Sequence, residues 1–71
     1  MKILVNGKET EAKEKSTLWD VIRSQINLES ADDAKGIAAA LNGTVVPKKD
    51  WDSISLSLND SVEIVHAVQG G

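Results

Sequence analysis

The beginning of the chain combines a strand pattern with a turn signal. Residues 2–6 predict a short strand that places Ile3 and Val5 on one face, because successive side chains of a strand point to opposite sides. Asn6-Gly7 follows, and this dipeptide is typical of a type I′ hairpin turn, which needs positive φ at both central positions. The polar run 9–13 is therefore expected to return as an edge strand, where charged side chains discourage unwanted pairing.

Apolar residues then recur at a helical spacing. Thr17 is a good N-cap residue, and Asp20 three positions later completes a short version of the capping box. The helix is expected to end near Asn27. Beyond it, Leu28 is expected to plug the core and residues 29–35 to form a polar loop. The apolar face of the helix is made of residues three or four positions apart, namely Leu18, Val21, Ile22 and Ile26.

The middle of the chain predicts a second hairpin. Residues 36–41 form a short run that ends at the turn dipeptide Asn42-Gly43, which favours a strand. A helix is the alternative, because alanine is the strongest helix former. Residues 44–46 predict another short strand, which Pro47 stops because proline cannot donate to a strand ladder. In the alanine-rich strand we expect Ile37, Ala39 and Leu41 to point one way and Ala38 and Ala40 the other.

The last segment predicts an irregular crossing followed by the most strand-like run. Residues 48–58 are expected to cross the core, anchored by Trp51, Ile54 and either Leu56 or Leu58. A turn follows in which Asn59 can take the left-handed conformation. Residues 62–68 predict the final strand. One of its faces would carry Val62 and Ile64, and the other Glu63, Val65 and Ala67.

The order of these elements predicts an α+β fold of the β-grasp, ubiquitin-like type. One main helix would pack on one face of a mixed sheet of four to five strands. The first and last strands can pair in parallel at the centre, because the long path between them supplies the crossover that a parallel pair requires. Residues 1–68 are then expected to form one domain, and residues 69–71 a flexible C-terminal tail.

Composition and charge exclude several classes of function. The 71 residues carry a formal net charge of −3 and no cysteine. The eight lysine and arginine residues are scattered and aromatic residues are few, so nucleic acid is not an expected partner. No apolar run reaches the length of a membrane span, about 20 residues. The expected location is the cytoplasm.

Candidate chemistry lies at the end of the sequence, at Gly70-Gly71. Two glycines would make a terminal carboxylate slender and unhindered, able to enter another protein's active site. A chain of this size has no room for an enclosed substrate pocket of about 300 Å³ or more. Its acidic pairs lack the regular spacing of a calcium loop, so no metal site is expected. His66 is expected to be a half-buried strand residue and not a ligand.

Four segments of the sequence form an ordered set. They are Ile3 to Gly7, Ala40 to Pro47, Trp51 and Asp60 to Gly71, the last ending in valine-glutamine-glycine-glycine. Together they resemble the sulfur carrier proteins of thiamine biosynthesis. The departures are Lys48, where the family usually has arginine, and Asn59, where it usually has glycine. Lysine keeps the charge but loses the planar fork of arginine.

The resemblance implies a carrier without catalysis of its own. An adenylating, E1-like partner enzyme would use ATP and Mg²⁺ to adenylate the carboxylate of Gly71. A sulfur donor such as a cysteine desulfurase or a rhodanese-type protein would then replace AMP and leave a thiocarboxylate. Thiazole synthase would take this sulfur for the thiazole ring. Gln69 and Gly70 would form the tail that reaches the partner's active site.

The residues beside the tail predict a docking patch on the sheet face opposite the helix, formed by Glu63, Val65, Ala67 and Val68. A small subunit of molybdopterin synthase and a ubiquitin-like protein modifier are alternative functions, because both resemble this pattern in fold and tail. A plain interaction module with an incidental tail is a further alternative.

Overall fold

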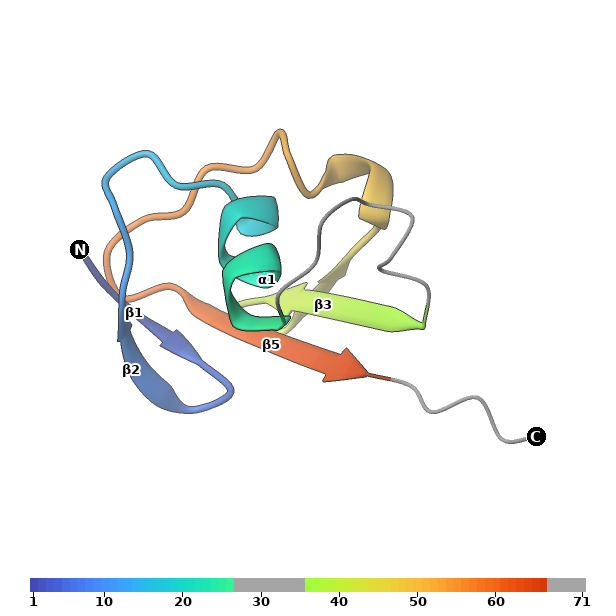
Figure 1. The fold of residues 1–71 in the computed structure, drawn as a ribbon, viewed down its shortest axis with the longest axis horizontal. Coiled ribbons are helices and arrows are strands. Elements are labelled where there is room, and N and C mark those ends of the chain that lie inside the picture. Colours follow the sequence, from blue (N-terminus) through green and yellow to red (C-terminus); the bar gives the residue numbers. More distant parts are fainter. Residues whose placement is uncertain (27–35, 67–71) are drawn as a thin grey trace.

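The fold is a mixed five-stranded sheet with helix α1 across one face, as Figure 1 shows for a computed structural model of the chain. The structure describes residues 1–26 and 36–66. The strand order is β2-β1-β5-β3-β4. The elements are β1 (Lys2–Val5), β2 (Lys8–Glu11), α1 (Leu18–Ile26), β3 (Ile37–Leu41), β4 (Thr44–Val46), the 3₁₀ helix η2 (Lys48–Asp50) and β5 (Ser61–His66).

The first and last strands lie side by side at the centre of the sheet. β1 and β5 are parallel, with Leu4 opposite Ser61 and Val5 opposite Val62. All other pairings are antiparallel, so the sheet is mixed as predicted. The path from β1 to β5 passes through α1, which supplies the crossover of a parallel pair. The predicted β-grasp fold is confirmed.

Both hairpins turn on an Asn-Gly dipeptide. Asn6 and Gly7 have φ values of 51° and 84°, and Asn42 and Gly43 have values of 51° and 88°. Positive φ at both central positions is the requirement of a type I′ turn, so the prediction is confirmed. A two-residue turn forces Val5 to pair with Lys8. The polar strand therefore begins at Lys8 and ends at Glu11, so the predicted range 9–13 began one residue and ended two residues too late.

The helix begins with the predicted capping box. The Asp20 amide donates to Thr17 Oγ1 at 3.1 Å, and the Thr17 amide donates to Asp20 Oδ2 at 3.0 Å. The next free amides of the helix, at Leu18 and Trp19, donate to the carbonyls of Ile54 and Trp51. These bonds satisfy donors that have no partner within a helix. The expected helix end near Asn27, the plug at Leu28 and the loop at 29–35 lie outside the described residues.

Asp20 gives the cap a pH dependence. Its hydrogen bond from the Thr17 amide, followed by those from the Thr17 hydroxyl and Arg23, lowers its pKa below the ordinary value of 3.8. A carboxyl group whose pKa is lower in the folded than in the unfolded state stabilises the fold fully above its unfolded-state pKa. This stabilisation is lost as the pH falls through the folded-state pKa. We expect Asp20→Ala to lose about 1 kcal/mol of stability at pH 7.

The measurement is the free energy of unfolding of both chains between pH 7 and pH 2. The difference should persist down to about pH 4 and shrink below it. Asp52→Ala is the control, because Asp52 is exposed and lies outside the helix. A difference between Asp20→Ala and the unaltered chain that stays constant to pH 2 would contradict the role of the carboxylate.

The core lies between α1 and the facing side of the sheet. Its fully buried side chains are Ile3, Leu18, Ile22 and Val62, so the predicted faces of β1, α1 and β5 are confirmed. Trp51 is buried as well, stacks on Trp19 at 6.1 Å between ring centroids, and donates from Nε1 to the Val46 carbonyl at 2.9 Å. Of the two alternative anchors in the crossing segment, Leu56 is buried and Leu58 is 63% exposed.

Two other expectations concern β3 and β5. The alanine-rich run is a strand and not a helix, because β3 pairs with β4 on one side and β5 on the other. The expectation that His66 is half-buried was wrong, because the residue is exposed. His66 ends β5 and pairs with Ile37, the first residue of β3, so it lies at the margin of the sheet, where Ile37 is buried but His66 is not.

Candidate functional site

The central strand β5 carries the described part of the candidate site. Val62 is buried and Ile64 is partly buried on the helix side of the sheet. Glu63 and Val65 alternate with them and are exposed, as the sequence predicted for the opposite face. Val65 is 59% exposed, so β5 presents an apolar side chain to the solvent on this face. The other predicted site residues, Ala67, Val68, Gln69, Gly70 and Gly71, lie outside the described residues.

The strand register extends this surface across β3 and β4. Val65 is paired with Ala38, Glu63 with Ala40, and Ala40 in turn with Val45. Directly paired residues project from the same face of a sheet. Val45 is 71% exposed and Ala38 is exposed too. We call this surface the outer apolar face and define it as Ala38, Ala40, Val45 and Val65, with Glu63 among them.

Sequence reasoning found only part of this face. It placed Glu63 and Val65 beside the tail, but it did not assign Val45 to a site. The signal that could have extended the patch was already present, because the alternation in β3 puts Ala38 and Ala40 opposite the core residues Ile37 and Ala39. The missing information was the register between β3 and β4, which decides that Val45 stands next to Ala40.

Glu63 is the one charged residue in the outer apolar face as defined above. Among the residues that the structure describes, Glu63 has no ion-pair partner. Lys48, the position where the resemblance expected arginine, is exposed on η2, so its side chain is accessible to a partner. A lone carboxylate in an apolar surface is suited to meet a cationic group on another protein.

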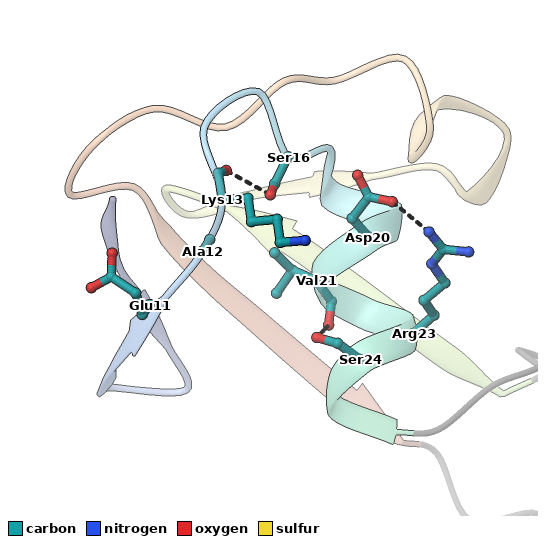
Figure 2. Close-up of a pocket in the computed structure, with 8 residues that line it drawn as sticks. All are labelled: Glu11, Ala12, Lys13, Ser16, Asp20, Val21, Arg23 and Ser24. Atoms are coloured by element: carbon teal, nitrogen blue, oxygen red, sulfur yellow. Dashed lines mark hydrogen bonds and ion pairs between the residues drawn. The ribbon is translucent and has the colours of Figure 1, made fainter.

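A separate groove lies between β2 and α1, and Figure 2 shows the side chains that line it. Its volume is about 610 Å³. Four of the polar side chains along it bond to nearby parts of the chain. Arg23 pairs with Asp20 at 2.9 Å, and the hydroxyls of Ser16 and Ser24 donate to the carbonyls of Lys13 and Val21.

Residues 1–26 and 36–66 contain no group of three or more His, Cys, Asp or Glu side chains that could hold a metal ion. No helix in these same ranges is both long and apolar enough to cross a membrane.

The sheet order and the single helix across it define a small β-grasp protein. Comparisons with known proteins agree with this class. The family model of the ThiS family matches residues 3–71. The chain therefore belongs to the ThiS family, whose members are small carrier proteins of thiamine biosynthesis. A search of curated proteins found no match.

Two solved structures of a thiamine biosynthesis protein from Geobacter metallireducens resemble this fold. The crystal structure of this ThiS protein has a TM-score of 0.74 and 25% sequence identity, and the match covers 100% of both chains. The NMR solution structure has a TM-score of 0.72 at 25% identity, and the match covers 100% of this chain and 88% of the other. The likeness thus extends over the whole domain.

Proposed function

We propose that this chain carries sulfur for thiazole formation in thiamine biosynthesis, as a thiocarboxylate on Gly71. The observation that carries the proposal is the match of the ThiS family model up to residue 71, which includes Gly70 and Gly71. The chain itself performs no catalysis in this scheme. Its location would be the cytoplasm, where ATP and the partner enzymes are available.

The chemistry requires activation because a carboxylate resists nucleophiles. In the adenylating enzyme, a Gly71 carboxylate oxygen attacks the α-phosphate of ATP, and pyrophosphate leaves. ATP and Mg²⁺ are bound by that enzyme, whose cations neutralise the charge that develops on the phosphate. The terminal sulfur of a persulfide on a cysteine desulfurase or a rhodanese-type protein then attacks the acyl carbon, and AMP leaves. A thiol next attacks the donor sulfur of the resulting acyl disulfide, so that the S–S bond breaks, the thiol and the donor cysteine form a disulfide, and the thiocarboxylate is released.

The chain contributes position to these steps. β5 lies at the centre of the sheet with a neighbouring strand on each side, so the tail would start from a rigid body. The outer apolar face would dock on the adenylating enzyme, with Ala67 and Val68 continuing the patch toward the tail. Docking makes the encounter of Gly71 with ATP effectively intramolecular, which lowers its entropic cost. Thiazole synthase would use the same rigid body and tail when it withdraws the sulfur.

The decisive experiment is intact mass spectrometry of the chain after incubation with an adenylating enzyme of thiamine biosynthesis, MgATP and a sulfur donor. We expect the mass to rise by the difference between one sulfur and one oxygen atom. The chain should also restore growth without thiamine to a strain that lacks its own sulfur carrier. A chain that gains no sulfur, or that is recovered instead as a conjugate on the lysines of other proteins, would overturn the proposal.

A further inference from the structure

The strand that leads to the tail, β5, continues beyond the end of its parallel neighbour β1. β1 pairs with β5 only at Ser61 and Val62, while β5 continues to His66. The reason is the turn at Asn6-Gly7, where positive φ at both residues takes the chain away from β5. Figure 1 shows β5 extending past the β1–β2 hairpin toward the chain end. Within the described residues, the backbone of β5 after Val62 therefore has no strand partner on this side.

The Asn6 side chain takes the place of that partner. The Ile64 amide donates to Asn6 Oδ1 at 2.8 Å, and Asn6 Nδ2 donates to the Ile64 carbonyl at 3.3 Å. The Asn6 backbone amide also donates to the Val62 carbonyl at 2.8 Å. A carboxamide can present its C=O acceptor and one of its two N–H donors on the same side, as the C=O and N–H of a single strand residue do. It thus extends the β1–β5 ladder by one step after the main chain has turned away.

The second Asn-Gly turn makes a comparable contact at the other end of β5. The Ser61 amide donates to Asn42 Oδ1 at 2.9 Å, and the Asn42 amide donates to the Ser61 carbonyl at 2.7 Å. Asn42 Nδ2 also donates to Asp60 Oδ1 at 3.1 Å. Asn42 therefore holds the first residue of β5, whereas Asn6 holds Ile64, close to the residues that precede the tail.

We propose that Asn6 is a positioning residue, whose carboxamide fixes the direction in which β5 delivers the tail to the adenylating enzyme. This inference rests on the proposed function. The role needs an acceptor, a donor and tolerance of a left-handed backbone in one short side chain, which asparagine combines. If the end of β5 samples several directions, only a fraction of molecules can dock productively, and the apparent affinity falls by that fraction.

The test compares Asn6→Gly with Asn42→Gly. Both substitutions keep the positive φ of the turn and remove only the carboxamide, since glycine adopts this conformation without strain. For Asn6→Gly we expect hydrogen exchange of the Ile64 amide to accelerate about five- to tenfold. The Glu63 amide in the same chain, which belongs to the pair with Ala40, should change less. Asn42→Gly should leave Ile64 unchanged.

Steady-state adenylation gives the functional measurement. We expect Asn6→Gly to raise the KM for the carrier about three- to tenfold with kcat unchanged, because productive molecules become rarer but react normally once docked. Asn42→Gly should keep both constants. Asn6→Asp retains the acceptor for Ile64 but loses the donor, so its KM should fall between those of Asn6→Gly and the unaltered chain.

Equal Ile64 exchange in the two glycine variants would overturn the inference, as would an equal KM. If the unaltered chain is not adenylated at all, the proposed function fails and the positioning role fails with it. The two failures are distinguishable, because a failure of the positioning role alone leaves adenylation of the unaltered chain intact.

Discussion

Removal of Gly71 is expected to abolish thiocarboxylate formation while leaving the domain folded. The shortened chain would still end in a glycine carboxylate, but this group would stop about 3.5 Å short, the length of one extended residue. A misplacement of about 1 Å can cost a hundredfold in rate, so the loss should exceed that factor. The measurement is sulfur loading followed by intact mass, with circular dichroism to establish that the fold is unchanged.

Asp52→Ala is the control for this deletion. Asp52 is exposed and lies outside both the tail and the outer apolar face, and the substitution keeps the chain length and the terminal glycines. We expect it to accept sulfur at a rate close to that of the unaltered chain. Gly71→Ala tests the steric requirement separately, because its carboxylate is in register but carries a methyl group beside the reacting carbon. Normal loading of the chain that ends at Gly70 would exclude Gly71 as the sulfur-bearing residue.

The fold could be predicted from the sequence wherever a buried face imposed a period. The spacing of Leu18, Val21 and Ile22 identified α1, and these three side chains are buried against the sheet. The alanine-rich strand was harder to predict, because local propensity favours a helix there. Pairing with β4 and β5 overrides this propensity, and such long-range pairing is visible in sequence only through turn signals such as Asn42-Gly43.

The candidate site was predictable to the extent that it follows from alternation along one strand. Glu63 and Val65 were assigned to the outer face in this way. Val45 was missed because its place beside Ala40 depends on strand register. The contact of Asn6 with Ile64 joins residues 58 positions apart, and the local sequence of Asn6 explains only its turn. Long-range contacts of this kind decide the direction of β5, and no local pattern reports them.

Val65→Asp is expected to weaken the complex with the adenylating enzyme by at least about tenfold. The substitution would place a second carboxylate on the outer apolar face beside Glu63. Docking would then have to remove water from a charge in an apolar contact, which is costly unless a cation pairs with it. A central apolar residue of an interface can contribute about 2 kcal/mol or more, so the tenfold loss is a lower bound. The fold should survive, because Val65 is 59% exposed.

Leu58→Asp is the matched control. Leu58 is 63% exposed, so it resembles Val65 in size, polarity and accessibility, but it lies in the turn before β5 and not on the outer face. We expect it to leave the dissociation constant unchanged. Isothermal titration calorimetry with the adenylating enzyme would provide the dissociation constants, and thermal unfolding would show whether each variant retains its stability.

Val45→Asp determines how far the docking surface extends. If the contact covers β3 and β4 as well as β5, this variant should also lower the affinity, since Val45 stands next to Ala40 on the same face. If only Val65→Asp weakens binding, the contact is confined to β5 and the residues that follow it. A stably folded Val65→Asp chain that binds as tightly as Leu58→Asp would show that the adenylating enzyme docks elsewhere.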